Sequence, residues 1–106
     1  MKNGIYFVTF QSNQQDFGNG TAIVQDSKVN GGDFGFVYKG QVNGNSLKLH
    51  VSQHDKSVTS VFGANTTFYL DLVIDETENG YLLQGSMNGA SDNQIQIQAK
   101  YIGDLI

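Results

Sequence analysis

Residues 46–52 have the sequence Ser-Leu-Lys-Leu-His-Val-Ser, in which leucine or valine alternates strictly with polar residues. Residues 94–101, Gln-Ile-Gln-Ile-Gln-Ala-Lys-Tyr, follow the same period of two. This period is typical of a β-strand with one face in an apolar core and the other in water, because successive side chains point to opposite faces. The side chains predicted to point inward include Leu47, Leu49, Val51, Ile95 and Ile97.

Other segments of the chain also have the length and composition of strands. They are residues 5–10, 21–25, 34–40, 68–74 and 81–87, with a shorter piece at 27–30. Asn/Gly-rich sequences such as Gly18-Asn19-Gly20 and Asn79-Gly80 lie between several of them and are expected to form tight turns. The least strand-like segment is 53–65, which we expect to be a loop, a short helix or a plug over one end of a barrel.

Together these segments predict an all-β fold with a single domain over residues 1–106. Short connections favour antiparallel neighbours, so the expected architecture is a small up-and-down β-barrel of about eight strands. Closing the barrel removes exposed sheet edges, which a chain without proline cannot protect with that residue. Such a barrel can be filled by side chains or can hold one small ligand, and the sequence leaves both alternatives open.

The composition indicates a protein of the reducing cytoplasm. The chain has no cysteine, so disulfides and zinc–thiolate sites are excluded. The apolar segment 5–10 is too short for the core of a signal peptide or for a membrane span. The expected location is therefore cytoplasmic, with no association with a membrane.

The charge pattern favours a basic partner. The formal net charge is -4, and all six basic residues are lysines, which lie scattered along the sequence. Arginine is the preferred side chain for recognising phosphates and base edges, and the chain has none. We therefore expect no direct binding of nucleic acid.

The sequence contains no arrangement typical of a catalytic, cofactor or metal site. The only histidines are His50 and His54, which would stand about 13 Å apart on one strand, too far for one metal ion. The glycine-rich residues 31–35 lack the spacing of a phosphate-binding loop and are expected to form a turn or bulge. We therefore expect a protein that is not an enzyme and needs no cofactor.

One acidic cluster stands out, and it suggests a site for a protein partner. Asp75, Glu76 and Glu78 lie close together before Asn79-Gly80, at an expected hairpin tip. They could dock a basic protein surface, or they could be an ordinary solvated turn. The alternative function is a carrier of an apolar small molecule or lipid, bound among the inward-pointing residues named above.

Several short motifs, in the right order, resemble the type III secretion negative regulator family (GrlR-like). The motifs are Met1-Lys2-Asn3-Gly4-Ile5-Tyr6, Gly31-Gly32-Asp33, Val37-Tyr38-Lys39-Gly40, Leu49-His50-Val51 and Ala99-Lys100-Tyr101-Ile102. The resemblance implies an eight-stranded, calycin-like or lipocalin-like β-barrel with an apolar interior, in a cytoplasmic homodimer. It also implies a repressor of the locus of enterocyte effacement that acts by binding a transcriptional activator, without touching DNA.

The chain departs from the family pattern at one functional position. The best-known member binds its activator through an exposed run of four acids. The matching residues here are Asn43-Gly44-Asn45-Ser46, which contain no acid. The activator-binding site is therefore not carried over, and the acidic cluster at residues 75–78 belongs to a different hairpin.

Overall fold

The computed structural model describes residues 1–12, 16–55, 57 and 67–106 of the chain. Eight strands follow one another along the sequence, and the described residues contain no helix. The strands are β1 (Gly4–Ser12), β2 (Asp16–Gln25), β3 (Lys28–Gly32), β4 (Phe36–Asn43), β5 (Ser46–Gln53), β6 (Thr67–Thr77), β7 (Gly80–Met87) and β8 (Ala90–Gly103).

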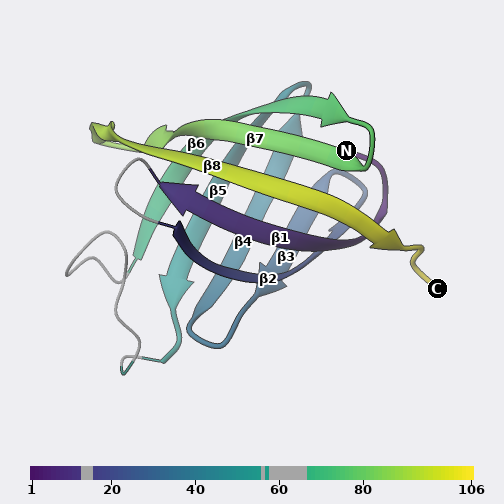
Figure 1. Ribbon diagram of the computed structural model, residues 1–106, viewed down its shortest axis with the longest axis horizontal. Helices are drawn as coiled ribbons and strands as arrows, with labels where there is room; N and C mark the ends of the chain where they lie inside the picture. Colours follow the sequence, from purple (N-terminus) through teal and green to yellow (C-terminus); the bar gives the residue numbers. More distant parts are fainter. Residues whose placement is uncertain (13–15, 56, 58–66) are drawn as a thin grey trace.

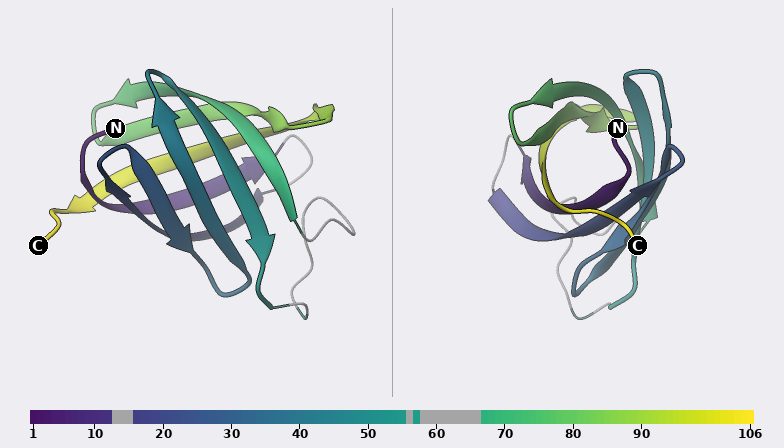
Figure 2. Two further views of the ribbon diagram at one scale, coloured as in Figure 1. Left: turned by 180° about the vertical axis from the view of Figure 1, so that it is seen from behind. Right: turned by 90° about the vertical axis from the view of Figure 1, so that its right-hand side faces the viewer.

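Each strand pairs antiparallel with the next, and β8 pairs back with β1 to close the barrel. The strands wrap around a common axis in Figure 1, and the end-on view in Figure 2 shows the ring that they form. The predicted antiparallel up-and-down barrel is therefore confirmed. The longest-range pairing joins Ile5 of β1 to Gly103 of β8.

One turn prediction and the start of one predicted strand were wrong. Gly18-Asn19-Gly20 lies inside β2, where the pairing with β1 becomes irregular and Gly18 has a φ of 67°. A β-bulge of this kind uses the same residue type as a turn, which explains the error. Phe34 was placed in a strand, but β4 begins at Phe36, and the Phe34 side chain is 72% exposed.

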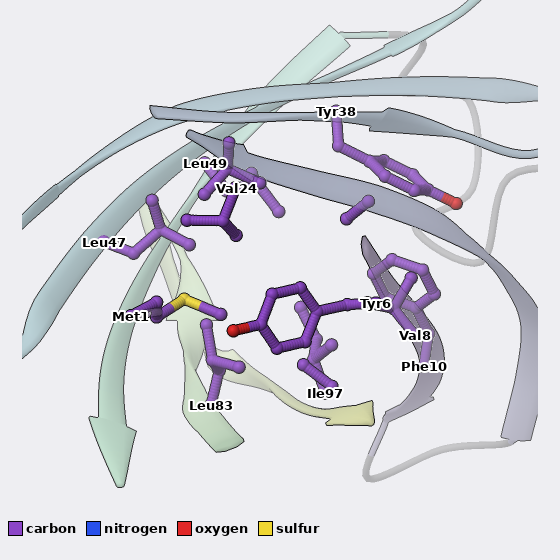
Figure 3. A pocket seen from close by; sticks show the side chains of 13 residues that line it. Met1, Tyr6, Val8, Phe10, Val24, Tyr38, Leu47, Leu49, Leu83 and Ile97 are labelled. Carbon is purple, nitrogen blue, oxygen red and sulfur yellow. The ribbon is translucent and has the colours of Figure 1, made fainter. Parts of the chain in front are cut away.

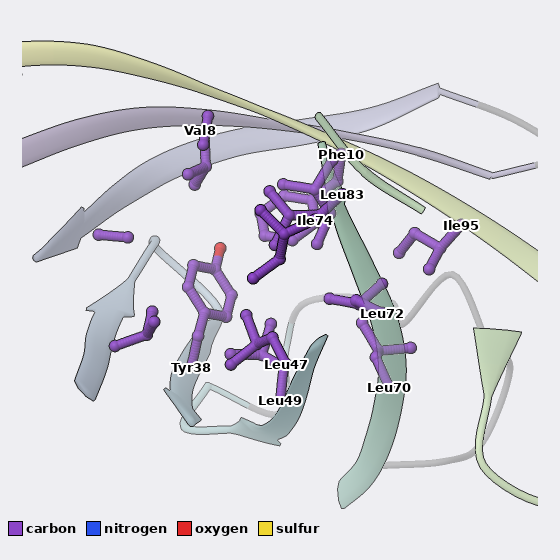
Figure 4. Packing of buried hydrophobic residues seen from close by; sticks show 14 of the residues in the cluster. Val8, Phe10, Tyr38, Leu47, Leu49, Leu70, Leu72, Ile74, Leu83 and Ile95 are labelled. Atoms are coloured by element: carbon purple, nitrogen blue, oxygen red, sulfur yellow. The ribbon is translucent and has the colours of Figure 1, made fainter. Parts of the chain in front are cut away.

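The alternating side chains fill the barrel with apolar groups. Figure 3 shows Tyr6, Leu47, Leu49, Leu83 and Ile97 pointing into one end of the interior. Figure 4 shows the packing of further buried residues from β6 and β8. All five residues predicted to point inward, Leu47, Leu49, Val51, Ile95 and Ile97, are buried.

Most of segment 53–65, for which a loop, a helix or a plug was predicted, lies outside the described residues. Its first residue, Gln53, ends β5. Within the described ranges, no helix is long and apolar enough to cross a membrane.

The lysines are scattered along the sequence, but the strand register brings three of them together. Lys28, Lys39 and Lys48 lie on neighbouring strands and line one groove on the outer wall of the barrel. They are far apart along the sequence, but antiparallel pairing brings them to the same face.

Candidate functional site

A cleft of about 330 Å³ lies at the end of the barrel where the N-terminal residues meet the β6–β7 turn. Figure 1 shows the N-terminus beside the start of β7 at this end. The cleft is lined by three tyrosines, two glutamates and two lysines. These are Tyr6, Tyr81, Tyr101, Glu76, Glu78, Lys2 and Lys100. We refer to it below as the tyrosine cleft.

The tyrosines come from three neighbouring strands and pack around Tyr6. The Tyr6 side chain is fully buried and also lines the barrel interior, so it separates the cleft from the core. Its ring meets the ring of Tyr101 edge to face, with centroids 5.6 Å apart. The ring of Tyr81 lies 6.0 Å from it in a tilted arrangement. Such aromatic contacts favour a single arrangement of the rings.

Lys2 connects these tyrosines through both its backbone and its side chain. Its backbone N–H donates to the Tyr81 hydroxyl at 3.0 Å, and its carbonyl accepts from the Tyr6 hydroxyl at 2.6 Å. Its ammonium lies 4.3 Å from the centroid of the Tyr101 ring. The Tyr101 ring therefore already takes part in a cation–π interaction within the protein.

Two glycines allow the strands to approach closely at this end. A Cβ atom on Gly4 would lie 2.3 Å from Cε2 of Tyr101, so the absence of a side chain makes room for that ring. A Cβ atom on Gly80 would lie 2.0 Å from the carbonyl oxygen of Ala99, and its φ of 155° also disfavours other residues. Both glycines thus determine how Tyr81 and Tyr101 are placed.

The structure separates the three acids that the sequence placed together. β6 continues to Thr77, so Asp75 and Glu76 lie in a strand and only Glu78 lies in the turn. Glu76 pairs with Tyr81 and follows the inward alternation of Ile74, which brings it to the rim of the cleft. Asp75 has the opposite orientation, on the outer wall. The expected hairpin tip was therefore correct only for Glu78.

One side of the cleft, at Glu76 and Tyr81, suits a cationic group. Directly paired residues such as Glu76 and Tyr81 have Cβ atoms about 5 Å apart, so a carboxylate and an aromatic ring flank the same space. Burial, and secondarily the neighbouring Tyr81, raises the pKa of Tyr6 to about 12. The Tyr6 hydroxyl consequently stays neutral at physiological pH and keeps its hydrogen bond to Lys2.

The barrel interior has little free space at the end that Tyr6 lines. The cavity there measures about 30 Å³, close to the volume of one water molecule, and is surrounded by apolar side chains (Figure 3). Ligand sites for drug-sized molecules usually span about 300–1,000 Å³. An apolar ligand at this end would require the side chains around Met1 and Tyr6 to move.

Neither histidine lies in the cleft. His50 is half-buried on the outer wall against Tyr69, and a ring nitrogen of His54 lies 2.8 Å from the carbonyl oxygen of Asp33. No group of three or more potential metal ligands occurs among the residues that the structure describes.

The sequence analysis missed the three cleft tyrosines as members of one site. Tyr6 was named only in a family-like motif, Tyr81 fell only in the strand-like segment 81–87, and Tyr101 was named in an alternating strand and a family-like motif. Their proximity depends on the closure of β8 on β1, which local patterns do not reveal. In comparisons with known proteins, no family model and no curated protein matches the chain. The resemblance to the secretion regulators therefore stays a prediction.

Proposed function

We propose that this barrel is a non-enzymatic cytoplasmic regulator that captures a basic segment of a protein partner in the tyrosine cleft. The observation that carries the proposal is the joint presence of Glu76, Glu78 and the tyrosine rings around one space of about 330 Å³. Aromatic faces and carboxylates together recognise lysine and arginine side chains, through cation–π contacts and charge-assisted hydrogen bonds.

The arrangement favours a cationic side chain over a free anion. An incoming ammonium or guanidinium can lie against Tyr81 while it pairs with the Glu76 carboxylate on the same face. Lys2 and Lys100 balance the charges of Glu76 and Glu78, so the attraction for a cation is local to the Glu76 carboxylate and the Tyr81 ring and does not come from a net charge of the cleft. The resemblance described above adds the kind of partner, a transcriptional activator, and the consequence, repression of its target genes.

The test is a comparison of two variants with matched charge changes. A pull-down from an extract of the source cells is made with the wild-type protein, with Glu76→Gln/Glu78→Gln, and with Asp75→Asn/Asp71→Asn. Both variants lose two negative charges, but only the first changes the cleft. We expect the wild type and the second variant to retain a basic protein at low salt. The first variant should lose that protein.

The opposite result is equally clear. If all three proteins retain the same partner to the same extent, the cleft acids are not the binding site. If both variants lose the partner equally, the attraction depends on net charge alone and the cleft has no specific role.

Size measurement by sedimentation of the purified protein tests the accompanying proposal that the barrel is a homodimer.

The alternative function, transport or sensing of an apolar molecule, gains no support from the filled end of the interior. It makes a distinct prediction, which is a lipid that co-purifies with the protein and is detected by mass spectrometry after solvent extraction. Protein that is free of such a ligand and binds a basic partner would favour the cleft.

A further inference from the structure

The outer wall of the barrel over β3, β4, β5 and β6 carries a second, differently charged surface. A groove of about 410 Å³ is lined there by Lys28, Lys39, Lys48, His50 and Tyr69. It contains half of the six lysines of a chain whose net charge is -4. We refer to it below as the lysine groove.

The strand register defines the spacing of the three lysines. Lys28 pairs with Gln41, which pairs with Lys48, so these three residues form one row across β3, β4 and β5. In the next row, Lys39 pairs with His50. With strands about 4.8 Å apart and residues on one face about 6.6 Å apart, Lys28 and Lys48 are separated by about 10 Å and each lies about 8 Å from Lys39. The three lysine side chains therefore start from a triangle of backbone positions.

The surroundings leave this positive charge available to a ligand. All three lysines are exposed, and within the described residues no carboxylate forms an ion pair with Lys28 or Lys39. The acid that pairs with Lys48 across the strands is Asp71, whose carboxylate accepts a hydrogen bond from the Asn88 side chain at 2.8 Å. That carboxylate is held by Asn88 on the side away from the groove.

Tyr69 forms one edge of the groove. The Lys48 ammonium lies 5.1 Å from the centroid of the Tyr69 ring, and the centroid of the His50 ring lies 4.8 Å from the same point. Both neighbours contact the Tyr69 ring, whose side chain stays 46% exposed, so at most one ring is open here to a stacked base. Three ammonium groups without arginine also contact too few phosphates to hold a nucleic acid firmly.

We propose that the lysine groove docks an extended acidic segment of a protein partner. Carboxylates two residues apart in an extended segment lie about 7 Å from each other on one face, which is within reach of flexible lysine side chains about 8 Å apart. The amides of Asn30 and Gln41, which lie among the lysines, can hydrogen-bond to the backbone of the segment. This surface is separate from the tyrosine cleft and has the opposite charge preference.

The experiment measures binding of a fluorescein-labelled hexaglutamate peptide by anisotropy at low salt. The wild type is compared with Lys39→Gln, with Lys28→Gln/Lys39→Gln/Lys48→Gln, and with Gln98→Glu, which changes the net charge by the same amount as Lys39→Gln at an exposed residue of β8. We expect affinity to fall about threefold for the first variant and more than about tenfold for the triple variant, with little change for the control. Circular dichroism verifies that the exposed substitutions leave the barrel folded.

Three results would overturn the proposal. Equal weakening by Lys39→Gln and Gln98→Glu would mean that only net charge matters. Tighter binding of a single-stranded oligonucleotide with the same number of charges would make nucleic acid the ligand. Salt-sensitive self-association that the triple variant abolishes would make a second copy of this chain the occupant, through its own acids at residues 75–78.

Discussion

Tyr6 and Tyr101 meet edge to face, with their ring planes at 81° and their centroids 5.6 Å apart. The two residues pair across β1 and β8, which are the strands that close the barrel. The closure of the fold and the construction of the tyrosine cleft thus depend on the same pair of side chains. Changes around this pair should affect stability and binding together.

Gly4→Ala should destabilise the protein by about 2–3 kcal/mol, because the added Cβ would lie 2.3 Å from Tyr101 and 2.9 Å from the Gly103 carbonyl oxygen. The control is Gly103→Ala, at a position with nothing within 4 Å of the added atom, where we expect a change below about 0.5 kcal/mol. Urea unfolding of both variants gives the comparison. Equal midpoints would mean that β1 and β8 can separate locally at little cost.

Stability should fall in alkaline solution, in part through Tyr6. The ordinary tyrosine pKa is near 10 in the unfolded chain, and burial raises it to about 12 in the fold. The stabilisation that depends on the Tyr6 proton is therefore complete below about pH 10 and is lost as the pH rises through about 12. Thermal unfolding of the wild type and Tyr6→Phe between pH 8 and 12 tests this. The unfolding temperature of the variant should depend less steeply on pH than that of the wild type.

Asp33→Ala should cost about 2–3 kcal/mol, because one carboxylate satisfies several donors in the turn between β3 and β4. It accepts the backbone N–H groups of Gly35 and Phe36, each at 2.8 Å, and also the Tyr38 hydroxyl. Tyr38→Phe removes only the last of these bonds and should cost about 1 kcal/mol. Chemical denaturation that ranks the two variants in the reverse order would contradict this account of the turn.

Leu72→Ala should destabilise the barrel by about 2–5 kcal/mol, since its side chain is only 2% exposed in the core. The adjacent Val73 is 50% exposed on the outer wall, so Val73→Ala should change stability by less than about 0.5 kcal/mol. Both residues lie on β6, which makes them a matched pair for calorimetry. A similar loss for the two variants would indicate that the outer face of β6 is covered by another chain.

Lys2→Gln should strengthen the binding of a basic ligand in the tyrosine cleft by about two- to fivefold. The Lys2 ammonium lies 4.3 Å from the Tyr101 centroid and occupies the ring face that an incoming cation could use. Removing that charge also lowers repulsion near Glu76 and Glu78. Titration with a labelled oligoarginine peptide tests this. The control is Lys28→Gln, which removes one positive charge from the outer wall instead of from the cleft.

Sequence periodicity was sufficient for the barrel but not for its sites. Leu47, Leu49 and Val51 alternate so regularly that only one face can be buried, and the structure agrees. Glu76 was misplaced because β6 continues through polar residues, whose propensity for turns suggested that the strand ends earlier. Pairing within a sheet outweighs such local preferences.

The lysine groove could have been found from the sequence with one additional step. The Asn43-Gly44-Asn45-Ser46 turn sets Asn43 opposite Ser46, and counting back along both strands places Lys39 opposite His50. The tyrosine cleft could not be found in this way. Tyr6 and Tyr101 meet through the closing pair of strands, and no short turn determines the register of that pair.

The pairing of β1 with β8 also has a consequence during synthesis on the ribosome. β1 is translated before its partner β8, so one edge of the nascent sheet stays open until β8 has emerged. Closing a contact between Ile5 and Gly103 spans almost the full chain, which makes it an intrinsically slow step. The nascent barrel is therefore exposed to aggregation until β8 has emerged, and a chaperone that shields β1 would act before that point.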